Sequence, residues 1–176
     1  MNFIKDMFFS ILLSRKSFKQ LGNQKLVCFS VLFVFVQTVQ VLLNIYCDNI
    51  VGLKLLRQYV YGFLKLIFFT GSLWVFYKIA FKKSMLAIFL KGVFAISIFS
   101  LFLIPLRFLE NAQKIISLLL GIFALIYFYF FVSENVSLEK KEKSMLGVFI
   151  ILANLVSKFL AFFSMLIFNT ICSGKI

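Results

Sequence analysis

Apolar residues come in long blocks along this chain, and short polar segments separate them. A helix rises about 1.5 Å per residue, so roughly 20 residues cross a hydrocarbon core of about 30 Å. Within lipid, a helix satisfies the hydrogen bonds of its own backbone. The pattern predicts an all-α, polytopic transmembrane helix bundle in residues 26–176, with five spans at about 26–47, 59–77, 85–106, 115–133 and 145–171.

The first 25 residues follow another pattern. A helix over residues 2–13 would have Phe3, Ile4, Met7, Phe8, Ile11 and Leu12 on one side and Asn2, Lys5, Asp6 and Ser10 on the other. This arrangement is typical of an amphipathic helix that lies in the membrane interface. The apolar stretch at 7–13 lacks the features of a cleavable signal peptide, so we expect the N-terminus to be retained. We therefore predict an interfacial unit in residues 1–25, in which a basic collar follows the helix: Arg15, Lys16, Lys19 and Lys25.

Composition and charge support the membrane class. Of the 176 residues, 62% are hydrophobic and only 14% are charged, and the net charge is +13. Because the cations gather between the spans, they predict a bilayer with anionic headgroups as the partner, and not a nucleic acid. With the N-terminus in the cytoplasm, the inner segments hold eleven Lys and Arg residues and the outer segments five. This bias predicts a C-terminus that lies outside or in a lumen.

Two of the predicted spans begin alike. Residues 83–89 read Lys-Ser-Met-Leu-Ala-Ile-Phe, and residues 143–149 read Lys-Ser-Met-Leu-Gly-Val-Phe. The interval covers two spans with their loops, so both copies would run in the same direction through the membrane. A parallel duplication and a chance similarity between two helix starts are the two interpretations.

Three amides lie on one face of the first span. Gln37, Gln40 and Asn44 recur at the spacing of a helix face that is otherwise apolar. Such amides form hydrogen bonds between helices within membranes, which contribute about 0.6 to 2 kcal/mol each. One interpretation is contact between helices, and the other is a face that lines a path for a solute. Small polar residues in the next two spans, at 70–72, 97 and 100, predict close helix contacts.

Three lysines fall within spans. Lys65 and Lys91 lie about six residues from a rim, so their long stems predict snorkelling to the headgroups. Lys158 is central in the last span, where a lysine costs about 2.5 to 3.5 kcal/mol, but the apolar residues around it outweigh that cost. Asn154 lies one turn earlier on the same face. We consider a binding role for Lys158 and Asn154, and alternatively a lysine that reaches a rim through helix tilt.

The sequence lacks the residues that several kinds of chemistry require. All six acidic residues lie outside the predicted spans and there is no His, which excludes an intramembrane carboxylate relay, a His-ligated metal and a Ser-His-Asp arrangement. We expect no catalytic activity, no metal and no cofactor. Cys28, Cys47 and Cys172 are scattered and have no metal-ligand spacing. Cys47 and Cys172 both fall at the predicted outer rim, where a disulfide and simple apolar filling are the alternatives.

The chain resembles the Yip family of five-span membrane proteins. The resemblance rests on residues 9–21, an amphipathic, basic, Phe-containing entry, on the five-span plan, and on the basic, Ser-containing entry to the last span at 137–145. The Pro often found near Arg15 and the acidic-aromatic-Gly-Pro signature of the eukaryotic branch are absent. The resemblance implies a non-catalytic, membrane-organising or interaction role, and it favours a bacterial inner membrane over a eukaryotic endomembrane.

Two functions follow as hypotheses. The first is a membrane scaffold that interacts with other membrane proteins or with its own copies. The second is a small transporter or permease subunit that binds an anionic solute or lipid headgroup through the candidate intramembrane polar site: Lys158, Asn154, Gln37, Gln40 and Asn44. Polar residues that converge on one cavity would favour binding, whereas dispersed residues would favour packing.

Overall fold

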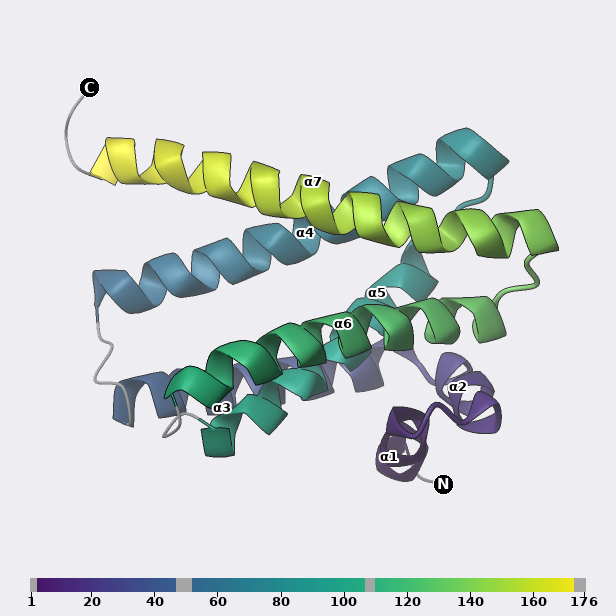
Figure 1. Ribbon diagram of the computed structural model, residues 1–176, viewed down its shortest axis with the longest axis horizontal. Helices are drawn as coiled ribbons and strands as arrows, with labels where there is room; N and C mark the ends of the chain where they lie inside the picture. The colour runs from purple at the N-terminus through teal and green to yellow at the C-terminus, as the bar shows by residue number, and fades with distance from the viewer. Residues whose placement is uncertain (1–2, 47–51, 107–109, 173–176) are drawn as a thin grey trace.

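The computed structural model describes residues 3–46, 52–106 and 110–172, and every element within these ranges is helical (Figure 1). The elements are α1 (Phe3–Ile11), α2 (Arg15–Gly22), α3 (Leu26–Tyr46), α4 (Leu53–Phe81), α5 (Leu86–Ile96), the 3₁₀ helix η1 (Ser97–Leu106), α6 (Glu110–Asn135) and α7 (Lys140–Cys172). The predicted all-α class is therefore confirmed.

Four helices are long and apolar enough to cross a membrane. They are α3, α4, Ile115–Asn135 of α6 and Lys140–Thr170 of α7, with mean hydropathy between 1.4 and 2.6 in their most apolar parts. They coincide with four of the five predicted spans. Helix α4 begins and ends beyond the predicted limits of 59 and 77, because the amphipathic turns at both ends continue the helix.

The remaining predicted span, 85–106, is divided in the structure. An α-helix covers Leu86–Ile96, and a 3₁₀ helix follows over Ser97–Leu106. The hydroxyls of Ser97 and Ser100 donate to the carbonyls of Phe94 and Ser97, three residues earlier, at 2.6 Å in each case. A fifth span therefore stays a prediction, and the structure shows four apolar helices of spanning length among the described residues.

The long helices run side by side and alternate in direction (Figure 1). Helices α3, α5 and α7 start at the end of the bundle that carries the N-terminus, and α4 and α6 start at the opposite end, near the C-terminus. We call these the N-terminal end and the C-terminal end of the bundle. The two copies of the seven-residue repeat thus both lie at the N-terminal end.

Aromatic side chains fill the core around α6. Tyr127 and Phe131 of α6 are fully buried, and both contact the ring of Phe18 from α2, at centroid distances of 5.0 and 6.4 Å. Phe131 also packs edge-on against Phe29 of α3 at 6.1 Å, and Tyr127 against Phe99 of η1 at 5.2 Å. Such pairs contribute about 0.5 to 1.5 kcal/mol each beyond the area they bury.

Helix α7 packs mainly on α4 through small side chains. Ala153, Ser157 and Ala161 recur at every fourth position of α7, and each is fully buried. Small residues at this spacing allow two membrane helices to approach closely, so dispersion contacts between them replace contacts with lipid. The opposite side of α7 exposes large apolar side chains such as Leu155 and Phe159, as a surface in hydrocarbon requires.

Three residues of the predicted basic collar, Arg15, Lys16 and Lys19, lie in a helix, α2, and polar contacts hold this helix against the bundle. The Lys91 amine of α5 donates to the carbonyl of Gly22, the last residue of α2, at 2.7 Å. The amide of Asn135 in α6 donates to the carbonyl of Phe18 at 2.9 Å. Lys91 therefore binds a protein carbonyl, where we had predicted snorkelling to headgroups. A side chain at Gly22 would collide with the amide of Asn135, which would then have to move away from α2.

Candidate functional site

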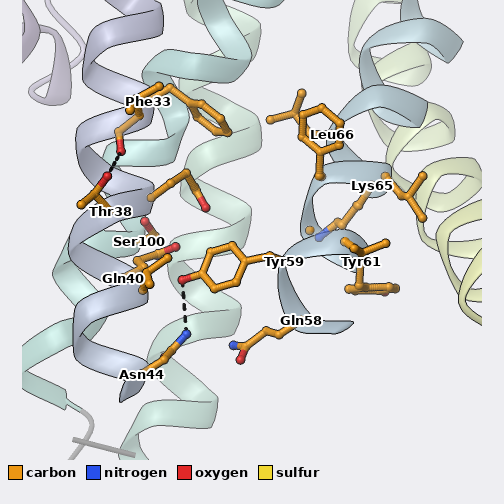
Figure 2. A pocket seen from close by; sticks show the side chains of 17 residues that line it. Phe33, Thr38, Gln40, Asn44, Gln58, Tyr59, Tyr61, Lys65, Leu66 and Ser100 are labelled. Carbon is orange, nitrogen blue, oxygen red and sulfur yellow. Dashed lines mark hydrogen bonds between the residues drawn. The ribbon is translucent and has the colours of Figure 1, made fainter. Parts of the chain in front are cut away.

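A groove of about 900 Å³ lies between α3 and α4. The two helices are antiparallel here, and η1 contributes one residue, Ser100 (Figure 2). Aliphatic and aromatic side chains make up much of the wall. The polar residues that line the groove are Gln37, Thr38, Gln40, Asn44, Gln58, Tyr59, Tyr61, Lys65 and Ser100.

All three predicted amides of α3 line this groove, because residues 37, 40 and 44 lie on the helix face that is turned toward α4. Asn44 is buried, and its amide donates to the hydroxyl of Tyr59 at 3.4 Å. Tyr59 extends from α4 across the groove to α3 (Figure 2). Asn44 thus makes the contact between helices that one of the two interpretations requires.

The two glutamines behave differently. Gln37 and Gln40 are both half-buried in the groove, and neither side chain forms a hydrogen bond with another described residue. Burial of an amide in an apolar medium costs about 1 to 3 kcal/mol when the amide forms no hydrogen bond. The two side chains therefore offer donors and acceptors that a bound molecule can satisfy.

Lys65 supplies the positive charge of the groove. Its amine is directed from α4 toward α3, above Tyr59 (Figure 2). Helix α4 begins at Leu53, about three turns before Lys65, so the lysine lies deeper along its helix than the sequence predicted. Among the described residues that line the groove none is acidic, and Lys65 forms no ion pair or hydrogen bond with any described residue.

Lys158 and Asn154 of α7 do not line the groove. Lys158 is exposed, on the helix that packs most extensively on α4. The carbonyl of Asn154 accepts a hydrogen bond from Ser157 at 2.9 Å. The five residues of the predicted polar site thus fall into two groups: the three amides of α3 in the groove, and the α7 pair outside it.

Sequence reasoning missed the α4 side of the groove. Gln58 and Tyr59 lie at the edge of the predicted second span, where polar residues are ordinary, and Lys65 was interpreted as snorkelling. A signal was present, because Gln58, Tyr61 and Lys65 recur at the spacing of one helix face. What the sequence could not supply is that this face of α4 meets the amide face of α3.

The two repeat copies meet at the N-terminal end. Phe89 and Phe149, which occupy the same position in the two copies, both pack edge-on against Tyr77 of α4, at 5.7 and 6.2 Å. Lys83 of the first copy forms an ion pair at 2.6 Å with Glu142, the residue before the second copy. The copies also differ, since α5 begins at Leu86, after Lys83, whereas residues 143–149 lie wholly within α7. A disulfide between Cys47 and Cys172 stays a prediction, because Cys47 lies outside the described residues.

Compared with family models, with curated proteins and with solved structures, the chain matches none of them. The function is therefore inferred from the groove and from the arrangement of the helices.

Proposed function

We propose that the protein is a non-catalytic, multi-pass integral membrane protein with five spans, and that its α3–α4 groove binds an anionic lipid. The observation that carries the proposal is the convergence of Gln37, Gln40 and Lys65 on one groove whose other walls are largely apolar.

The length of the α5–η1 segment supports five spans. Eleven α-helical residues at about 1.5 Å and ten 3₁₀ residues at about 2.0 Å give about 36 Å, more than the roughly 30 Å of a hydrocarbon core. Figure 1 places this segment beside α3 and α6, and both helices contact it. A five-span path puts the two termini on opposite sides of the membrane, which agrees with the charge bias of the loops.

The groove is amphipathic along its length, as a lipid is. Asn44, Gln58 and Tyr59 lie toward the C-terminal end of the bundle, whereas Phe33 and Leu66 lie at the other end of the groove (Figure 2). A lipid would place its headgroup among the amides and its chains beside the aromatic and aliphatic side chains. Lys65 lies between the two ends, where its long stem can bring the amine to a phosphate.

The edge of the groove favours entry from the bilayer over entry from water. Val34 and Phe63 line the groove, and they are 61% and 57% exposed. An apolar edge of this kind faces hydrocarbon in a membrane bundle. A lipid reaches such a groove by lateral diffusion, whereas a free anionic solute would first have to leave water.

Binding of two lipids to the purified protein tests the proposal. Native mass spectrometry of the protein in a neutral detergent would compare phosphatidylglycerol with phosphatidylcholine, and inorganic phosphate would be added as a competitor. A hydrogen bond to a charged group contributes about 1.5 to 3 kcal/mol, so Lys65→Met should weaken phosphatidylglycerol binding by about 10- to 100-fold. Lys65→Arg should largely retain it, and phosphatidylcholine binding should change little.

Three results would redirect the proposal. Equal binding of both lipids to the wild-type protein would contradict a site for anionic headgroups. Unchanged phosphatidylglycerol binding in Lys65→Met would remove Lys65 from the site. Displacement of the lipid by millimolar inorganic phosphate would identify a free anion as the ligand and favour the transporter hypothesis. Lys158→Met is the matched control, because it removes a nearby cation that does not line the groove.

A membrane-organising role is the second candidate, and the resemblance to the Yip family implies it. The observation that favours it is the pair of short helices at the N-terminal end of the bundle: Lys91 and Asn135 bond to α2, and Tyr127 bonds to Ser10 of α1. Short helices at a membrane surface can alter lipid packing or bind other proteins.

A further inference from the structure

Helix α1 presents apolar side chains outward and polar ones inward. Ile4 and Phe8 of α1, and Leu12 in the turn that follows it, recur at every fourth position and are 80%, 69% and 74% exposed, whereas Asp6 and Ser10 are buried. Only part of the predicted apolar side of this helix, with Met7 at its centre, packs on the protein. A helix that faced water would show the reverse pattern.

Specific contacts fix this orientation. The Ser10 hydroxyl lies 2.7 Å from the hydroxyl of Tyr127 in α6, and it donates to the carbonyl of Met7 at 2.7 Å. The ring of Phe3 packs edge-on against Phe29 of α3 at 5.1 Å. Because these contacts hold the inner side of α1, rotation about its axis cannot hide the outer apolar stripe.

Positive charge surrounds the stripe. Within residues 3–25 the cations are all exposed, and the acidic residue, Asp6, is buried. Arg15 interacts with Glu134 of α6 at 3.4 Å, but 79% of its side chain remains exposed. The outward charges of the α1–α2 unit are therefore cationic: Lys5, Arg15, Lys16, Lys19 and Lys25.

The position of α1 and α2 in the bundle indicates what their exposed surface contacts. Figure 1 shows α1 and α2 at the N-terminal end of the bundle, with their axes across those of the long helices. If the long helices cross a bilayer, α1 lies along its surface, at the depth where headgroups meet hydrocarbon. An apolar stripe beside exposed cations is complementary to a layer of anionic lipids at this depth.

We infer that the α1–α2 unit binds anionic headgroups of the leaflet at the N-terminal end, as a second lipid contact that is independent of the α3–α4 groove. Ile4, Phe8 and Leu12 enter the edge of the hydrocarbon, and Lys16 and Lys19 contact phosphates. Each such cation strengthens the attraction to an anionic surface about fivefold.

A single tryptophan at the stripe tests this contact in the whole protein. The chain has one tryptophan, so Trp74→Phe with Phe8→Trp leaves a reporter in α1, and Leu12→Trp is a second reporter if the first variant does not fold. In vesicles, energy transfer to pyrene-labelled phosphatidylglycerol should exceed transfer to pyrene-labelled phosphatidylcholine. Brominated lipids should quench the reporter, and aqueous iodide should not.

Charge variants then test the role of the cations. Lys16→Gln with Lys19→Gln should reduce the preference for phosphatidylglycerol at the α1 reporter several-fold. The matched control is Lys140→Gln with Lys141→Gln, which removes two exposed lysines from the start of α7 and should leave the preference largely intact. A tryptophan reporter at Leu42 lies on the lipid-facing side of α3, beyond the midpoint of that helix. Its energy transfer to phosphatidylglycerol should not change with either pair of lysine substitutions.

The inference is overturned by any of three results. Quenching of the α1 reporter by iodide with no transfer to lipid would mean that the stripe faces water. Protection from both iodide and brominated lipid would mean that a protein covers it. Equal transfer to the two pyrene lipids would overturn the preference for anionic headgroups. None of these outcomes depends on Lys65, so the groove and the α1–α2 unit are tested separately.

Discussion

Replacement of Lys91 by methionine distinguishes two roles for an intramembrane lysine. If Lys91 snorkels to headgroups, Lys91→Met removes a charge from the bilayer and should be neutral or stabilising. The structure instead places the Lys91 amine 2.7 Å from the carbonyl of Gly22, at the C-terminus of α2. Methionine cannot donate this hydrogen bond, so α2 should detach more often from the bundle.

The size of the effect follows from the contact. A hydrogen bond from a charged donor contributes about 1.5 to 3 kcal/mol, and a cation at a helix C-terminus adds about 0.3 to 1 kcal/mol. Asn135 still holds the carbonyl of Phe18, so we take the lower part of this range. The population of detached α2 should then rise by roughly 10- to 50-fold.

Hydrogen exchange of the protein in nanodiscs measures this population. Amides in residues 15–22 should exchange about 10- to 50-fold faster in Lys91→Met, while those of α4 and α7 keep their rates. Lys65→Met is the control, since Lys65 lies far along the bundle and has no contact with α2. Unchanged exchange in α2 would refute the docking role of Lys91 and support the hypothesis that it snorkels to the headgroups.

Three further predictions address the packing, the N-terminal end and the topology. A methyl group at Gly92 would lie within 3.1 Å of two buried rings of α6, so Gly92→Ala should destabilise the protein by about 1 to 2 kcal/mol in detergent unfolding. Gly121→Ala, where the methyl group meets open space, should be neutral or stabilising, and the opposite order would contradict the packing of α5 on α6. Lys83→Met should destabilise the protein by about 1 to 3 kcal/mol, because it leaves the largely buried carboxylate of Glu142 without its cation. In the same unfolding assay, the double variant Lys83→Met with Glu142→Met should recover part of the lost stability. A reporter fused after Ile176 should be active on the opposite side of the membrane from one fused at the N-terminus, and activity on the same side would exclude five spans.

Hydropathy predicted the long helices well, because a spanning helix needs little more than a continuous apolar run. It failed to show where α-helix gives way to 3₁₀ helix, since both parts of that segment are strongly apolar and hydropathy does not distinguish the two helix types. It also missed the stripe Ala153, Ser157 and Ala161, although its four-residue spacing is visible in the sequence. An amphipathic pattern alone did not predict that α2 is a second helix.

Only part of the candidate site could be predicted from the sequence, and the reason is physical. Spacing along one helix shows which residues share a face, so Gln37, Gln40 and Asn44 were found together. Spacing cannot show which other helix that face meets. The presence of Lys65 in the groove, and the absence of Lys158 from it, depend on how α4 packs against its neighbours, and no local pattern encodes this packing.

Filling the groove tests the central claim most directly. A Cβ at Gly62, in the wall of the groove, meets no atom within 4 Å, and the same is true of Gly121 on α6, outside the groove. Leucine at either position also improves helix propensity, so neither change should unfold the protein. In native mass spectra, Gly62→Leu should lose phosphatidylglycerol binding by tenfold or more, while Gly121→Leu binds as the wild type does. Equal binding by Gly62→Leu and the wild type would contradict a lipid site between α3 and α4.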